Sequence, residues 1–245
     1  METRTRSQAR LSEERLFYSG MALLIFALVV FGFAPTWFLR GTLSTTHPLK
    51  PLTPLVMLHG TLFTTWILLF VTQAGLISAR RQQLHMSLGI ATVALGAAMV
   101  VVGLLTAVWD NVPSPPVLPP MTNFAFPFFD IMAFATLLIG GYVTRRNPQT
   151  HKRLMLCATA VMLQPAIARL PFFPTTTVLG YEITTVIAFL LATPLLVWDF
   201  AQRGRPHYAT LIGLGVLGGE QLLRLAAWEN ETWLTFAGWL VRTLS

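Results

Sequence analysis

Hydrophobic residues along the chain are grouped in long runs that are separated by short polar or basic segments. A helix needs about 20 apolar residues to cross the hydrocarbon core of a bilayer. The pattern therefore predicts an all-α fold, a polytopic transmembrane helical bundle of about seven spans. The expected spans cover residues 17–39, 53–79, 86–109, 124–144, 151–170, 182–202 and 207–228.

The two ends of the chain are expected to lie outside this 17–228 transmembrane domain. Residues 1–16 are polar and lack the short apolar core of a cleavable signal peptide, so we expect a cytoplasmic N-terminal segment and a first span that is retained. Residues 229–245 are too short an apolar stretch to span. They contain Trp233 and Trp239, which predicts a short interfacial helix at the outer membrane surface.

Composition agrees with a membrane protein. Hydrophobic residues make up 54% of the chain and charged residues 11%, against roughly 25% charged in soluble domains, and the mean hydropathy is +0.61. A soluble domain is therefore excluded. The single cysteine, Cys157, lies in an apolar run, which excludes a disulfide framework and a zinc site built on several thiolates.

Basic residues gather in alternate loops of the seven-span arrangement. By the positive-inside rule, this bias predicts a bacterial inner-membrane protein with its N-terminus in the cytoplasm and its C-terminus outside. Anionic lipids at the cytoplasmic face are the expected partners, and the net charge of +7 needs no nucleic-acid explanation. Twelve of the 17 Lys and Arg residues fall on the predicted cytoplasmic side: Arg4, Arg6, Arg10, Arg15, Arg80, Arg81, Arg145, Arg146, Lys152, Arg153, Arg203 and Arg205.

Two of these loops share a pattern in which an Arg-Arg pair is followed by a histidine that opens the next span. The segments are "SARRQQLHMSLG", with His85, and "VTRRNPQTHKRLM", with His151. The positive end of a helix dipole favours the neutral imidazole, which is the form that binds metals. Two such histidines could hold the iron of a haem b, with Arg81 and Arg146 on its propionates. The same arginines could bind a quinone-like head group or lipid phosphates, and both histidines could be ordinary interfacial residues.

Ionisable residues inside spans are costly, at roughly 2.5–3.5 kcal/mol each near the bilayer centre on insertion scales, so each one is a candidate functional residue. Glu220 and Arg224 are four residues apart and are expected to pair on one helix face. His59 and Asp130 lie at similar depth, and a carboxylate there could orient the imidazole. The predicted intramembrane polar cluster in the outer half contains Asp130, Arg169, Glu220 and Arg224, with His59 at the same depth.

Regular spacing marks the inward faces of three spans. His59, Trp66 and Gln73 recur every seven residues, so their face is predicted to line a cofactor or quinone pocket, or to form a packed polar seam. A stripe of glycines at 89, 96 and 103 in the next span favours close helix packing. In the fifth span, His151 and Arg169 are five helical turns apart and are expected on one face.

The histidine segments also resemble known motifs. "RRQQLHMSLG" resembles the His-Arg-x-Leu-Gly motif, and "NPQTHKRLMLCATAVMLQPAIARL" the His-Arg-Arg-Trp-Met motif, of an uncharacterised bacterial family of multi-pass membrane proteins. The resemblance covers about residues 55–170. This chain differs from the motifs at Met86, Lys152 and Leu154.

The resemblance implies that His85, His151 and Arg169 are the positions of interest, but it implies no reaction. A looser similarity in layout is to cytochrome b561-type proteins, in which histidines on successive helices hold two haems. Only His59 is available here for the outer side.

The sequence leaves three functions open. The first is binding of haem b or a quinone-like ligand in electron transfer, at His85 and His151 with His59, Gln73, Arg81 and Arg146 as further candidates. The second is a non-enzymatic subunit or assembly factor of a larger membrane complex. The third is a small transporter that uses His59, Asp130, Arg169 and Glu220 as a proton or anion relay. Whether the protein is an enzyme stays open.

Overall fold

The computed structural model describes residues 2–44, 49, 51–110, 120–170, 177–178, 181–228 and 230–244. The described chain is helical apart from turns and one pair of two-residue strands, which confirms the all-α prediction. Its elements are α1 (Glu2–Phe33), the π-helix η1 (Ala34–Phe38), α2 (Pro54–Ser78), α3 (Gln82–Asp110), α4 (Pro120–Val143), α5 (Pro148–Ala160), the 3₁₀-helix η2 (Val161–Leu163), α6 (Gln164–Ile167), β1 (Thr177–Val178), β2 (Tyr181–Glu182), α7 (Ile183–Leu190), α8 (Pro194–Arg203), α9 (Tyr208–Ala227) and α10 (Glu231–Leu244).

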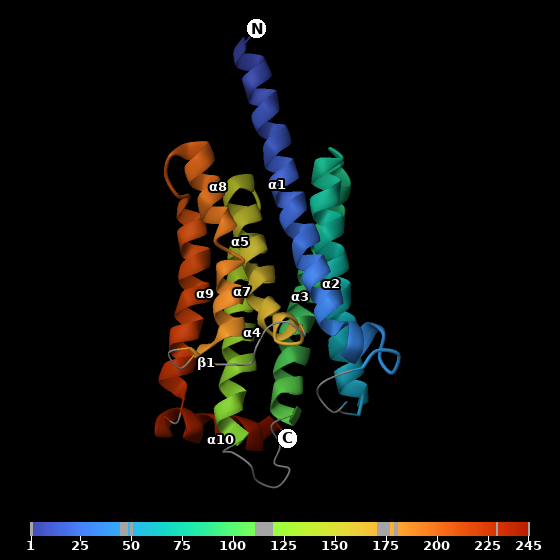
Figure 1. Ribbon diagram of the computed structural model, residues 1–245, viewed down its shortest axis with the longest axis vertical. Helices are drawn as coiled ribbons and strands as arrows, with labels where there is room; N and C mark the ends of the chain where they lie inside the picture. The colour runs from blue at the N-terminus through green and yellow to red at the C-terminus, as the bar shows by residue number, and fades with distance from the viewer. Residues whose placement is uncertain are drawn as a thin grey trace.

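The long helices run side by side, and α10 lies across one end of the bundle (Figure 1). The opposite end carries the N-terminus and the α2–α3, α4–α5 and α8–α9 connections. These are the segments that contain the clustered arginines, so the basic residues do gather at one end. We call it the basic end and the other the α10 end.

Five helical stretches of the described chain are long and apolar enough to cross a membrane. They are Leu11–Phe38, Pro54–Ser78, Gln82–Trp109, Phe124–Val143 and Val186–Arg203. The first extends into the predicted N-terminal segment, since α1 is continuous from Glu2 and has no break at residue 16. The predicted spans at 151–170 and 207–228 are not among the five.

The predicted fifth and sixth spans are each interrupted, and a proline explains both interruptions. A proline lacks an N–H, and its ring clashes with the carbonyl four residues earlier. Pro165 acts on Val161, where α5 gives way to η2, and Pro194 acts on Leu190, where α7 ends. The predicted fifth span is therefore not one regular α-helix, and the five-turn alignment of His151 with Arg169 stays a prediction. The predicted sixth span is confirmed in part, because Val186–Arg203 is long and apolar enough to cross a membrane.

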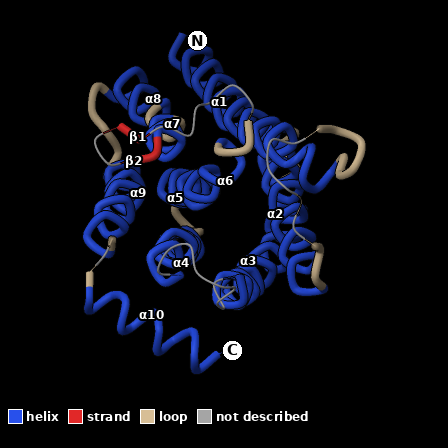
Figure 2. Tube along the Cα trace, turned by 60° about the horizontal axis from the view of Figure 1, so that its bottom comes forward, coloured by secondary structure: helices blue, strands red, loops and turns tan. Residues whose placement is uncertain are grey.

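Helix α5 occupies the middle of the bundle. Viewed from the side of the α10 end, α5 and α6 are surrounded by α1, α2, α3, α4, α9 and α7 (Figure 2). Six α5 residues near its end are buried or nearly so, including Leu156, Cys157 and Ala158. This central helix is also rich in polar residues. Neighbouring helices shield them from lipid, which explains why α5 lacks the apolar composition of the helices around it.

Close approaches between helices occur where glycine replaces a side chain. A Cβ atom at Gly32 would lie 2.2 Å from the Ala166 carbonyl oxygen, at the crossing of α1 and α6. In the predicted stripe, a Cβ atom added at Gly96 would lie 2.5 Å from the Leu138 side chain of α4. One added at Gly103 would lie 3.0 Å from the Ile131 side chain. Gly89 has nothing within 4 Å, so the packing role holds for two of the three stripe glycines.

Replacing Gly32 with alanine is expected to destabilise the bundle by about 1–3 kcal/mol, because the obstructing atoms belong to the backbone and cannot rotate away. Gly20→Ala in the same helix is the control, since nothing lies within 4 Å of its added Cβ. Thermal unfolding in detergent measures both. Equal midpoints for the two variants would show that α1 and α6 do not pack as described.

Candidate functional site

The sequence around the two predicted histidines fixes where each helix begins. Asn147 caps α5, because its side chain accepts from the backbone N–H groups of Gln149 and Thr150 at 3.2 and 3.3 Å, and Pro148 fits the first helical turn. The α2–α3 turn passes through Arg80, which adopts a left-handed φ of 61°. The helix cap at Asn147 and the turn at Arg80 each place a histidine in the first turns of a helix at the basic end.

His85 and His151 lie together. Their ring centroids are 6.2 Å apart and their planes are nearly perpendicular, at 79°. Both side chains are half-buried. The structure thus brings together two residues that are far apart in sequence, and we call them the histidine pair.

One ring nitrogen of each histidine is held by a neighbouring helix. His151 Nδ1 lies 2.8 Å from the Gly141 carbonyl oxygen in α4 and donates to it, because a carbonyl can only accept. The Gln73 carboxamide in α2 reaches within 2.6 Å of His85 Nδ1, and when its nitrogen is turned to that side it donates there while its oxygen accepts from Gly89 N at 3.2 Å. Gln73, predicted to be on the inward face of its span, therefore contacts His85.

The contact with Gly141 fixes the tautomer of His151. Its proton is on Nδ1, so its Nε2 presents a lone pair. The His85 ring lies against both the Gln73 side chain and the Gln73 backbone carbonyl, which accepts from a ring N–H. In the part of the chain that the structure describes, His151 Nε2 has no hydrogen-bond partner. The histidine pair consequently offers a ligand the lone pair of His151 Nε2.

The other predicted cofactor residues lie in two places. Arg81 and Arg146 are exposed beside the pair in sequence, at the same basic end. His59 is near the start of α2, at the far end of that helix from the α2–α3 turn, and stacks on Phe63 with ring centroids 4.1 Å apart. His59 is therefore not part of the histidine pair site. Trp66, between His59 and Gln73, is buried and donates to Thr159 of α5 at 3.3 Å.

The predicted intramembrane cluster is formed by three of its four members. Arg224 contacts Asp130 of α4 and, at 3.0 Å, Glu220 of its own helix. The Glu220–Arg224 pair is thus confirmed, whereas Asp130 contacts Arg224 in place of His59. Arg169 lies apart, over the Phe33 ring at 4.6 Å, and donates to the Pro165 carbonyl at 2.6 Å.

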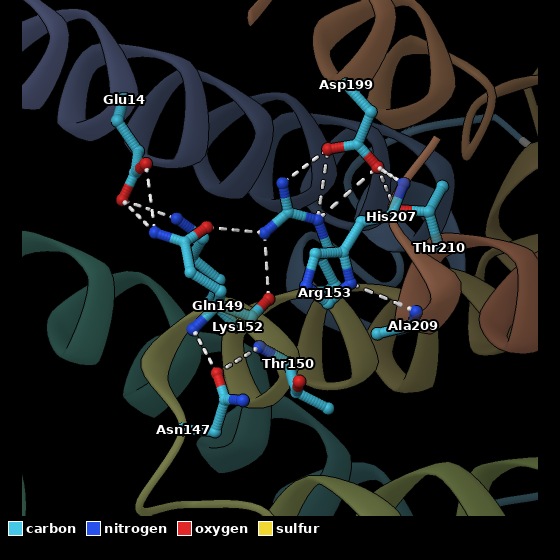
Figure 3. Close-up of polar contacts among 10 residues, drawn as sticks. All are labelled: Glu14, Asn147, Gln149, Thr150, Lys152, Arg153, Asp199, His207, Ala209 and Thr210. Carbon is cyan, nitrogen blue, oxygen red and sulfur yellow. Dashed lines mark hydrogen bonds and ion pairs between the residues drawn. The ribbon is translucent and has the colours of Figure 1, made fainter. Parts of the chain in front are cut away.

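A second buried ion pair was missed by sequence reasoning. Arg153 of α5 and Asp199 of α8 are 1% and 0% exposed, and they are in direct contact (Figure 3). Arg153 had been assigned to the cytoplasmic loop charges. Asp199, a carboxylate inside an expected span, was the available signal that a basic partner must lie at the same depth.

This inner ion pair is the centre of a hydrogen-bond network that joins four helices (Figure 3). Arg153 Nη1 donates to the Gln149 backbone and side-chain oxygens at 2.8 and 2.7 Å, and Gln149 donates to Glu14 of α1 at 3.3 Å. Asp199 also accepts from the His207 backbone N–H at 2.9 Å and from the Thr210 hydroxyl in α9. The network satisfies the polar atoms of both charged groups and reads as structural.

Comparisons of the chain with profiles of known protein families, with curated proteins and with solved structures found no match. The motif resemblance therefore stays a prediction, and the site must be judged by its geometry. Among the described residues, no group of three or more His, Cys, Asp or Glu side chains could hold a metal ion. Any iron at this site would depend on the two histidines as its protein ligands.

Replacing Asp199 with Asn is expected to cost about 3–5 kcal/mol of stability, because Arg153 then keeps its buried charge without a counter-ion. The double variant Arg153→Met with Asp199→Leu should cost less than the sum of the single variants. Glu231→Gln, at an exposed position, is the control and should change stability by less than about 0.5 kcal/mol. Unfolding in detergent measures all of them, and an unchanged midpoint for Asp199→Asn would refute the structural role.

Proposed function

We propose that the protein crosses a bacterial inner membrane seven times, with its basic end in the cytoplasm and its α10 end outside. The five apolar stretches supply five crossings. The α5–η2–α6 segment and α9 supply the other two, because they lie alongside the others and are shielded or paired where they are polar. The collection of arginines at one end supports this orientation.

The orientation is tested with single cysteines and a maleimide that does not cross membranes. The single native cysteine, Cys157, is fully buried, and a Cys157→Ala background ensures that the maleimide reacts only with the introduced cysteine. Glu231→Cys, at the start of α10, should react in intact cells, whereas Arg146→Cys should react only after lysis. Reaction of both from the same side would contradict an odd number of crossings.

The histidine pair supports a ligand-binding role, and its open acceptor favours a quinone-like head group in electron transfer. A hydroquinone hydroxyl donates a hydrogen bond, which His151 Nε2 can accept. The site lies where the α3 and α5 helices begin, a depth that a membrane-soluble ligand reaches from the bilayer. The observation that carries this proposal is the lone pair that the Gly141 contact leaves on His151 Nε2, beside the second imidazole of His85.

Haem b is the second candidate, and the proximity of the two histidines favours it. His85 and His151, with ring centroids 6.2 Å apart, would hold its iron, and the haem would supply one-electron transfer. Both Nε2 atoms must then present lone pairs, so the Gln73 amide would have to turn and accept from His85 Nδ1–H. The hydrogen bond from His151 to a carbonyl already matches that of a metal-bound histidine.

Purification in mild detergent separates the two candidates. We expect a quinone in the organic extract of the wild-type protein and a roughly 10- to 100-fold loss of quinone affinity in His85→Leu and His151→Leu, as expected when a buried hydrogen bond loses its partner. Gln73→Leu should also weaken binding. The control is Gln83→Leu, because Gln83 is exposed on the first turn of α3.

The absorption spectrum decides the alternative. A Soret band that disappears in both histidine variants would establish haem and refute the quinone assignment. Absence of both ligands, with no binding of an added short-chain quinone or haem, would refute the ligand-binding proposal altogether.

A further inference from the structure

The cluster formed by Asp130, Glu220 and Arg224 contains two carboxylates and one guanidinium inside the bundle. Asp130, Glu220 and Arg224 are 9%, 4% and 4% exposed. Both carboxylates meet the same nitrogen, Nη2 of Arg224, so they lie close to each other. If both were ionised, the cluster would carry one uncompensated negative charge in a medium of low dielectric constant, which is strongly unfavourable.

Among the described residues, the elements around the cluster supply no second positive charge. Helix α9 packs on α4, α5 and α7. On α4 the facing group is Asp130, and the described α7 side chains, residues 186–190, are apolar. The basic residues of α5 lie at its opposite end, around the Arg153 network. Phe126 covers the Arg224 guanidinium at 5.2 Å, and the charged residues of α10, Glu231 and Arg242, are exposed.

Arg224 itself is incompletely bonded. Its Nε and Nη1 atoms are buried and have no partner in the described part of the chain. The guanidinium therefore donates to both carboxylates through one nitrogen only. If it neutralised two negative charges, we would expect its other donors to bind them as well.

Gln221 provides an independent indication of a proton on Glu220. Its amide lies 2.6 Å from Glu220 Oε1, which is shorter than usual for N–H···O and within the range of O–H···O. The Gln221 carboxamide oxygen is buried and has no partner among the described residues. A half-turn of the amide, whose oxygen and nitrogen occupy equivalent positions, places that oxygen where it accepts from a protonated Glu220.

We propose that Glu220 is a proton-binding site within the membrane, held beside a permanent Asp130–Arg224 ion pair. Asp130 stays ionised because it contacts Arg224 directly. Glu220 exchanges a proton, from neutral carboxylic acid with Gln221 as acceptor to carboxylate with Arg224 as donor, and no other atoms change bonds. This site is distinct from the histidine pair, which lies at the basic end of the bundle.

Dicyclohexylcarbodiimide tests the proposal, because it reacts with protonated carboxyl groups in apolar surroundings. The carboxyl proton moves to a carbodiimide nitrogen while the carboxylate oxygen bonds to the central carbon, and the adduct rearranges to a stable N-acylurea. In wild-type membranes, peptide mass spectrometry should locate the adduct on Glu220. Labelling should fall as the pH rises and should be unaffected by Na⁺ at constant pH.

Asp130→Asn gives the sharpest variant. Arg224 then has Glu220 as its only counter-ion, so Glu220 should ionise and its labelling should fall at least 10-fold. A merely structural cluster predicts equal or greater labelling, because a loosened site is more accessible. Glu220→Gln removes the adduct, and Glu231→Gln, at an exposed position, should leave it unchanged. An adduct on Asp130 in place of Glu220, or protection by Na⁺, would overturn the proposal.

An infrared spectrum of the wild-type protein tests the same proton without any variant. A carboxylic-acid C=O band that shifts in deuterium oxide and decreases at high pH is expected. Its absence at neutral pH would overturn the proposal whatever the carbodiimide shows.

Discussion

The contact between Arg153 and Asp199 is the interaction on which the arrangement of the bundle depends. It places two opposite charges out of water at the centre of four helices, where an unpaired charge would be prohibitive. The desolvation is offset because both groups are almost fully hydrogen-bonded, to each other, to Gln149 and to the start of α9. Coulomb attraction alone gives little net stability in such pairs, so the value of the network lies in fixing one relative position of α5, α8 and α9.

The cluster of Asp130, Glu220 and Arg224, at the other end of α9, also combines arginine with carboxylates, but its charges are not balanced. Arg153 has one carboxylate and a full set of acceptors, whereas Arg224 has two carboxylates and two nitrogens without a partner among the described residues. A saturated network has a single low-energy charge state. An unbalanced one has two states of similar energy that differ by a proton. The difference in hydrogen bonding therefore separates a structural ion pair from one suited to proton exchange.

The hydrophobic pattern was sufficient to predict an all-α protein, the ends of α2, α3 and α4 to within a few residues, and the Glu220–Arg224 pair. It was insufficient wherever a residue's meaning depends on a distant partner. Arg153 looked like one more loop arginine, because nothing local distinguishes it from Arg146. Pro165 and Pro194 stand within long apolar runs, and hydropathy alone does not indicate where a proline interrupts a helix. The histidines were found by their shared motif, yet their proximity and the roles of Gln73 and the Gly141 carbonyl required the packing of α2, α3, α4 and α5.

The polar central helix also constrains how the protein is made. In the proposed seven-span arrangement, helix α5 cannot rest in lipid by itself with Arg153 exposed to hydrocarbon, and the partner residue Asp199 is synthesised 46 positions later. Until α8 and the beginning of α9 have left the ribosome, this segment would need shelter from the translocation machinery or from the helices already inserted. In that arrangement, stable insertion of the central helix depends on helices that are synthesised after it.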